Sequence, residues 1–125
     1  MTSEVPDVIR AYFDHINAER WDDFTELWHP DAELLALGAR PRRGRDDVVA
    51  YFPKIFSAWR EHHDEPTRVI ACGDTVTVEV AFRGVTTTGR PAEFGALDLF
   101  DLTDGRIRRL SNWYDILAAR AAFDT

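Results

Sequence analysis

The chain is poor in sulfur and in positive charge, and it has no long run of apolar residues. Cys72 is its only cysteine, so an intrachain disulfide is excluded; its place at the end of an apolar stretch predicts a buried, unreactive side chain. No segment is apolar for long enough to cross a bilayer and none reads as a signal peptide, which predicts a cytoplasmic protein. The 15 Lys and Arg face 22 Asp and Glu, and the net charge of −7 argues against partners such as nucleic acid or an anionic membrane.

Two groups of residues could bind an ion, and both are predicted to be solvated instead. Four arginines stand beside Pro41 and Gly44, which favours an exposed loop over a phosphate clamp, and neighbouring aspartates cancel part of their field: Arg40, Arg42, Arg43 and Arg45. His62 and His63 lie in a charged stretch read as a turn, and no second cluster with metal-ligand spacing accompanies them. We therefore expect neither a metal nor a cofactor.

Hydrophobic periodicity divides the chain, read as one domain over residues 1–125, into a helical part and a strand-rich part. A 3.6-residue period predicts helices over 6–18, 20–28 and 45–60, with Pro53 kinking or ending the third. Alternation and turn signals predict strands at 32–37, 68–73, 74–84, 92–102 and 106–115, before a short closing helix at 116–123. This order predicts an α+β fold: a cone-shaped barrel in which three N-terminal helices pack on a strongly curved, mostly antiparallel sheet that encloses a pocket.

One acidic residue interrupts an apolar strand face. In the hairpin at residues 93–115, Asp98 shares a face with Phe94, Ala96, Phe100 and Leu102. A carboxyl group buried without a partner costs roughly 2–7 kcal/mol, so Asp98 needs one. Either it belongs to a ligand pocket, or it only pins the sheet by accepting hydrogen bonds from the backbone or from a neighbour.

The same parity predicts the strand residues that form the other walls of such a pocket, and the helices predicted at 20–28 and 45–60 add Trp28, Phe56 and Trp59. An inward Asn112 stands out because a buried amide also needs partners, and it could orient Asp98 or touch a ligand. The expected substrate-binding residues are Trp28, Leu34, Ala36, Phe56, Trp59, Val80, Phe82, Phe100, Leu110 and Tyr114. Leu97, Leu99 and Trp113 have the outward parity, which predicts a homodimer through the outer face of the sheet.

At this point the chain resembles the nuclear transport factor 2-like superfamily, and within it the branch of ketosteroid isomerases and SnoaL-like polyketide cyclases. The resemblance extends from "VIRAYFDHINAERWDDFTELWHPDAEL" through "GRDDVVAYF" to "GRPAEFGALDLFDLTDGRIRRLSNWYD". It implies that Tyr12 matches the catalytic tyrosine of the isomerases and that Asp98 matches their protonated aspartic acid. In those enzymes an apolar site keeps this acid neutral, so that it donates a hydrogen bond to a developing oxyanion.

The match breaks at the general base. The isomerases hold it on the first strand, where this chain has Ala36. The Asp-Arg-Asp relay of the limonene epoxide hydrolases is also missing, because Ala96 and Asn112 take two of its three positions. The acid/base aspartate of the SnoaL-like cyclases falls on Asn112 as well. Asp115 has the opposite parity and is expected to cap the last helix.

Two classes of function therefore remain open. The first is a cofactor-free isomerase or cyclase acting on a hydrophobic polyketide- or steroid-like carbonyl compound. Tyr12 and Asp98 would stabilise the enolate, Asn112 would help position the substrate, and Asp98 could alone serve as general acid and base if its pKa lies near the working pH. The second is a non-catalytic ligand-binding or accessory protein that keeps the fold and the pocket.

Overall fold

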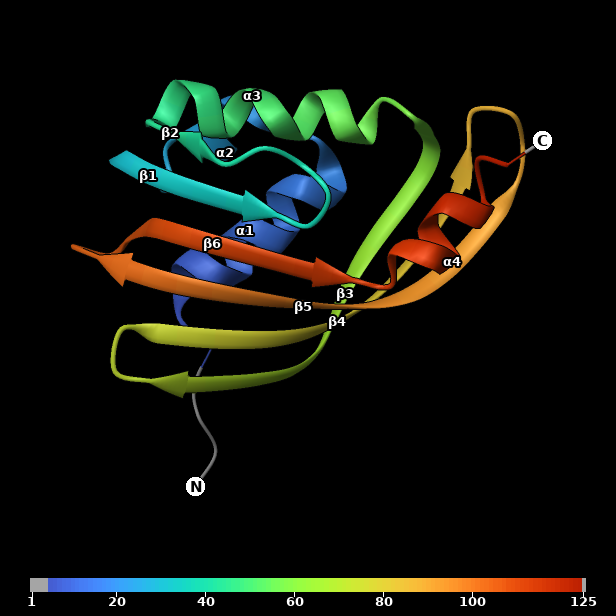
Figure 1. Cartoon of the computed structure of the whole chain (residues 1–125). Coiled ribbons are helices and arrows are strands. Elements are labelled where there is room, and N and C mark those ends of the chain that lie inside the picture. Colours follow the sequence, from blue (N-terminus) through green and yellow to red (C-terminus); the bar gives the residue numbers. More distant parts are fainter. Residues whose placement is uncertain (1–4, 125) are drawn as a thin grey trace.

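The computed structural model describes residues 5–124, which form four helices and a six-stranded sheet (Figure 1). The helices are α1 (Asp7–Ala18), α2 (Trp21–Thr25), α3 (Arg45–Phe56) and α4 (Ile116–Ala121). The strands are β1 (Trp28–Ala36), β2 (Arg42–Arg43), β3 (Trp59–Cys72), β4 (Thr75–Thr86), β5 (Pro91–Thr103) and β6 (Arg106–Tyr114). No helix in this described part of the chain is long and apolar enough to cross a membrane.

The strands are arranged in the order β2-β1-β6-β5-β4-β3. All neighbours run antiparallel except β1 and β6, which are parallel, so the sheet is mixed. The predicted α+β class, with helices from the N-terminal part on a mainly antiparallel sheet, is confirmed. The cone-shaped barrel is not: the edge strands β2 and β3 stay at opposite ends of an open sheet that is not strongly curled.

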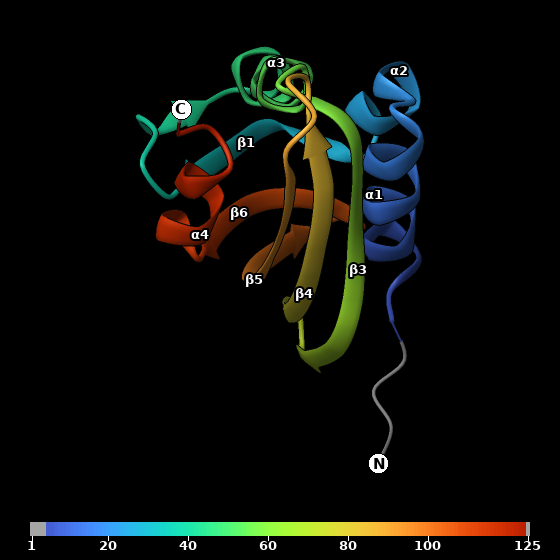
Figure 2. The same cartoon turned by 90° about the vertical axis from the view of Figure 1, so that its right-hand side faces the viewer.

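Aromatic side chains fill one end of the space between the helices and the sheet. The apolar stripe of α1 buries Ile9, Tyr12, Phe13 and Ile16, as its spacing predicts. The Tyr12 ring lies 4.9 Å from that of Phe100 in β5, and Phe24, Trp28 and Phe52 complete the cluster. In Figure 2, α1 and α2 lie beside β3, whereas α4 lies away from them, beside β5, and contributes to the same inner side through Ala119.

The third helix and the strand after it differ from the prediction. Helix α3 ends at Phe56 with Pro53 in its last turn, and β3 already begins at Trp59. The stretch predicted as a charged turn around His62 and His63 is therefore strand. Pro66 lies within this strand; a proline breaks an internal strand but is tolerated at an edge, and β3 is an edge of the sheet.

Two smaller expectations have opposite outcomes. Cys72 is exposed at the end of β3 and not buried; the edge position of the strand leaves one side of it open. Asp115 caps α4 as predicted, since its Oδ1 accepts a hydrogen bond from the Ala118 backbone N–H at 3.1 Å.

Candidate functional site

A cavity of about 290 Å³ occupies the end of the inner sheet face that the aromatic cluster leaves free. Its walls come from α3, β3, β4, β5, β6 and the C-terminal segment, and they consist of Tyr51, Ile55, Phe56, Ala58, Trp59, Asp64, Val80, Phe82, Phe94, Ala96, Asp98, Asn112, Tyr114, Ala119 and Phe123. Most of these side chains are apolar or aromatic. Among residues 5–124, the only acidic groups of the lining are Asp64 and Asp98, and no Lys, Arg or His lines the cavity.

Asp98 lies where the filled core ends and the cavity begins. Along β5 the neighbouring inward residue on one side, Phe100, is fully buried, and the one on the other side, Ala96, lines the cavity. Asp98 is 2% exposed and accepts a 2.6 Å hydrogen bond at Oδ1 from the side-chain amide of Asn112, its direct partner on β6. Burial raises the pKa of Asp98 to about 6, and the Asn112 hydrogen bond opposes this shift.

Asp64 is the residue that the sequence reasoning missed. It pairs with Phe82 of β4, and its side chain lines the same cavity as Asp98. Burial raises the pKa of Asp64 to about 7, and the negative charge of Asp98 adds to the shift. The stretch could have revealed it: read as a strand, residues 62, 64 and 66 alternate in phase with Phe82 and Val80.

Tyr12 lies behind the cavity and does not line it. Its ring is enclosed by the aromatic cluster and is 3% exposed. Burial and then the charges of Asp98 and Asp64 raise the pKa of Tyr12 well above its usual value, so the phenol stays protonated.

The structure divides the predicted site residues into two sets. Asp98, Asn112, Phe56, Trp59, Val80, Phe82 and Tyr114 line the cavity. Trp28, Leu34, Ala36, Phe100 and Leu110 lie instead in the packed core, each at most 6% exposed. Leu34, Ala36, Phe100 and Leu110 have the inward parity that the sequence indicated, and Trp28, expected on a helix, begins β1. Helices α1 and α2 fill their end of that face. Strand parity identifies which residues lie on the inner face of the sheet, but it does not show which part of that face is left unfilled by other side chains.

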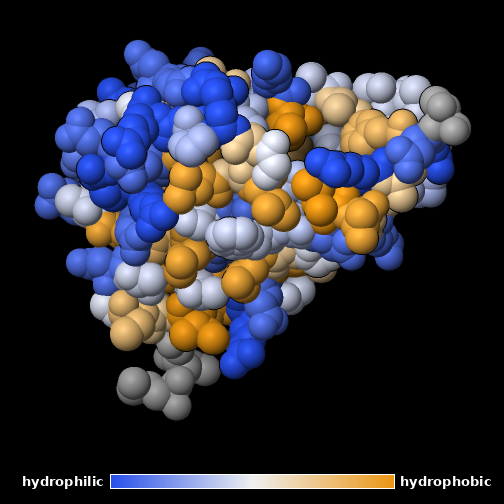
Figure 3. Space-filling model, in the orientation of Figure 1, coloured by the Kyte–Doolittle hydropathy of each residue, from blue (hydrophilic) through white to orange (hydrophobic). Residues whose placement is uncertain are grey.

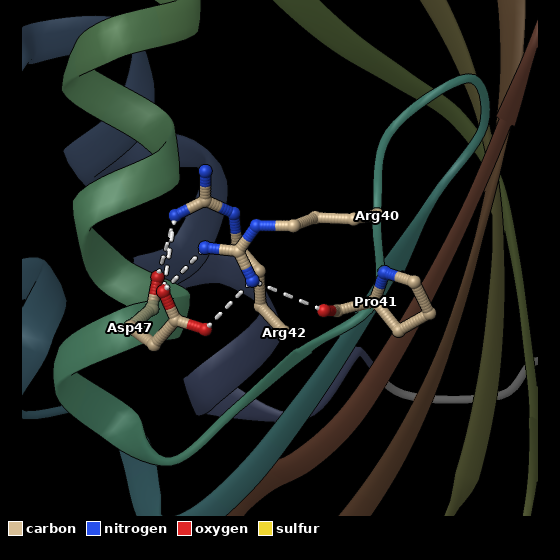
Figure 4. Close-up of polar contacts among 4 residues, drawn as sticks. All are labelled: Arg40, Pro41, Arg42 and Asp47. Atoms are coloured by element: carbon tan, nitrogen blue, oxygen red, sulfur yellow. Dashed lines mark hydrogen bonds and ion pairs between the residues drawn. The ribbon is translucent and has the colours of Figure 1, made fainter.

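The basic loop and the histidines have partners of their own. Arg40 and Arg42 both contact the Asp47 carboxylate at 3.3 Å, and Arg40 also donates to the Pro41 carbonyl (Figure 4). The His63 ring lies 2.8 Å from Glu65, on the surface. The His62 side chain, expected to be solvated, is only 3% exposed, because it stacks on Phe56 and its Nε2 meets Glu19.

The helices, the mixed sheet and the apolar cavity with acidic groups define a pocket protein of the nuclear transport factor 2-like fold. More narrowly, the chain belongs to the family of the SnoaL-like domain, whose model matches residues 9–110. The predicted relationship is thereby confirmed. A comparison with curated proteins finds no match.

Solved structures with the same fold cover nearly the whole chain at low identity. IdmH of Streptomyces antibioticus, a proposed polyketide cyclase, shares 22% identity, with a TM-score of 0.82 over 94% of this chain and 96% of its own. A proposed polyketide cyclase of Xanthomonas campestris pv. campestris shares 21%, with a TM-score of 0.86 over 94% of both chains. An LEH-like epoxide hydrolase of M. tuberculosis shares 16%, with a TM-score of 0.79 over 94% of this chain and 86% of its own.

Proposed function

We propose that this protein is a cofactor-independent enzyme that isomerises or cyclises a hydrophobic carbonyl compound, and that Asp98 carries the proton. The observation that supports this most directly is the place of Asp98: a buried carboxyl group facing an aromatic cavity, with a pKa of about 6. A group with such a pKa is present in both protonation states near neutrality, so it can take a proton and return it.

The chemistry follows from the two faces of the Asp98 carboxyl group. Asn112 donates to Oδ1 and so stabilises the charged form, which makes Asp98 a carboxylate base at neutral pH. The base removes a proton from the carbon next to a substrate carbonyl. The resulting enolate is protonated by Asp98 at another carbon, which is isomerisation. Alternatively it attacks a second carbonyl carbon, and the oxygen of that carbonyl then takes the proton from Asp98, which is cyclisation. This role replaces the oxyanion donor that the sequence suggested for Asp98.

The cavity favours an uncharged ring compound. Its aromatic walls offer flat apolar surfaces, and a carboxylate or phosphate ligand would meet two acidic groups without a cation to pair with. Polyketide-like and steroid-like ring ketones have this character. The similarity to proposed polyketide cyclases supports the same class. The similarity to an epoxide hydrolase is less informative. By resemblance, Ala96 and Asn112 occupy two positions at which the Asp-Arg-Asp relay of the limonene epoxide hydrolases needs charged side chains.

A non-catalytic ligand-binding role is the second candidate, favoured by one observation. Strand β1 brings no carboxyl group to the cavity, and Ala36, at the position of the missing base, is packed in the core. A binding protein would need the pocket and not the base.

Titration with equilenin, a fluorescent phenolic steroid that mimics an enol, tests the site. At pH 8 we expect wild-type protein to bind it and Asp98→Asn to bind it about 10–100-fold more tightly, because the neutral amide resembles the protonated Asp98 that faces the enol, whereas wild-type Asp98, with a pKa of about 6, is charged before binding. Asp101→Asn is the matched control: Asp101 lies on the same strand outside the cavity and accepts from Thr75. Equal binding by wild type and Asp98→Asn would contradict the role of Asp98.

A further inference from the structure

If Asp98 acts as the base, some other group must hold the carbonyl oxygen, and most donors of the cavity are engaged. The Asn112 amide donates to Asp98, and the Tyr114 hydroxyl donates to the Leu37 carbonyl at 3.2 Å. Tyr12 lies outside the lining. The acidic O–H groups left in the cavity are those of Tyr51 on α3 and of protonated Asp64 on β3.

The backbone of Asp64 is fixed, whereas its carboxyl group is free to meet a ligand. The Asp64 N–H donates to Asn17 Oδ1 at 2.8 Å, and the Asn17 amide donates to the Asp64 carbonyl at 3.0 Å, which ties β3 to the end of α1. Within residues 5–124 the Asp64 side chain has no hydrogen-bond or ion-pair partner, and it faces the cavity. An anchored backbone with an unoccupied acidic side chain is suited to contact substrate.

We propose that Asp64 is the catalytic acid opposite Asp98, and that it protonates the carbonyl oxygen of an uncharged ring ketone while Asp98 removes the neighbouring carbon-bound proton. This inference rests on the proposed function. The C–H electron pair forms the C=C bond, the C=O bond becomes C–O–H with the Asp64 proton, and Asp98 becomes neutral. In the return step Asp98 delivers its proton to carbon and the Asp64 carboxylate takes the O–H proton back, so no co-reactant is needed.

The groups that face Asp64 keep it protonated while Asp98 is charged. The charge of Asp98 of β5 acts on Asp64, and Tyr12 of α1, which stays neutral, is within its electrostatic range. Tyr51 of α3, Tyr114 of β6 and the apolar Phe82 of β4 line other walls. No basic side chain of the described residues lines the cavity, so none offsets the repulsion between the two carboxyl groups. Because the Asn112 hydrogen bond stabilises only the Asp98 charge, the single proton of the pair resides on Asp64.

The test is deuterium incorporation next to the carbonyl of 2-tetralone in D₂O, followed by NMR across pH. Wild type should accelerate exchange, with a rate that rises as Asp98 ionises near pH 6 and falls above about pH 7 as Asp64 loses its proton. Asp64→Asn should lower the rate by about 100-fold or more and remove the falling limb while the rising limb stays. A loss of folding would show in circular dichroism and would not change one limb alone.

Two control variants separate the alternatives. Glu65→Gln changes the next residue, which is exposed and paired with His63, and should leave the profile unchanged. Tyr51→Phe removes the other candidate donor; if it abolishes exchange while Asp64→Asn keeps the wild-type profile, the inference is overturned. If Asp98→Asn loses exchange and Asp64→Asn does not, only the role of Asp64 fails. If wild type itself does not accelerate exchange, the proposed function fails together with the inference.

Discussion

At the scale of single residues, the candidate site is a place where two acids are kept in an unfavourable environment. Asp98 and Asp64 both have pKa values well above the 3.8 of a free aspartate, chiefly because burial penalises their charged forms. Asp98 has the Asn112 amide as partial compensation, and Asp64 has no side-chain partner among the described residues. Such destabilised groups are typical of functional sites, where stability is lost in favour of reactivity.

The dependence of stability on pH should show how much the burial of these two carboxyl groups destabilises the folded protein. The folded protein holds protons on Asp98 and Asp64 that the unfolded chain releases near pH 4. The contribution of these two groups to the free energy of unfolding therefore falls as pH rises through pH 4–7. Replacing either by the neutral amide should therefore stabilise the protein at pH 8 by roughly 1–3 kcal/mol, and the gain should nearly vanish at pH 4. Urea unfolding of wild type, Asp64→Asn and Asp98→Asn at both pH values measures it. A stabilisation of the same size at pH 4 and pH 8 would show that the charge of the carboxyl groups does not cause it.

At the scale of elements, the cavity depends on an edge strand of the sheet and on the C-terminal segment. The edge strand β3 supplies Asp64 and Trp59. The short helix α4 and the residues after it supply Ala119 and Phe123, whose ring lies 5.1 Å from that of Trp59. None of the residues of α4 is fully buried, so packing alone holds this helix weakly and its cap at Asp115 matters more than usual.

Removing that cap should therefore affect binding more than folding. Asp115→Ala loses the hydrogen bond to the Ala118 N–H, a change that costs about 1 kcal/mol of helix stability. We expect a severalfold weaker affinity for equilenin, with a small shift of the thermal midpoint. Asp115→Asn is the matched control, since asparagine caps equally well. If both variants bind like wild type, α4 does not form a working wall of the site.

At the scale of the whole molecule, the outer face of the sheet carries apolar side chains that the chain itself does not cover. Leu97 and Trp113 are direct partners on β5 and β6, and they are 39% and 53% exposed. Apolar residues also gather along the middle of the face shown in Figure 3, while the part near β2 and the start of α3 is hydrophilic. We retain the proposal of a homodimer through the outer sheet face, because neighbouring apolar side chains exposed on a sheet favour association.

Sedimentation of the wild type and of Trp113→Glu tests the dimer. At tens of micromolar, wild type should sediment at twice the mass of the 14.3 kDa chain and the variant at the mass of one chain, because a buried glutamate would lack a partner across the two-fold axis. Leu117→Glu is the control, since Leu117 is 78% exposed but lies on α4. A monomeric wild type would show the homodimer prediction to be wrong.

The sequence by itself determined the fold class and the inner face of the sheet. The period of α1 and the alternation of β4, β5 and β6 are local properties of the chain, so Val80, Phe82, Asp98 and Asn112 could be assigned inward without coordinates. The capping by Asp115 is local in the same sense.

The tertiary structure alone decided where the cavity lies and which acids meet in it. Phe100 and Leu110 have the right parity but are covered by the aromatic cluster of the helices, which depends on packing between distant segments. Asp64 belongs to an edge strand whose proline and charges imitate a turn, and its carboxyl group is brought to the cavity of Asp98 only through the pairing of β3 with β4. Local pattern specifies which face of an element is buried. The position of an empty space, and the charges that share it, depend on the side chains that other elements place there.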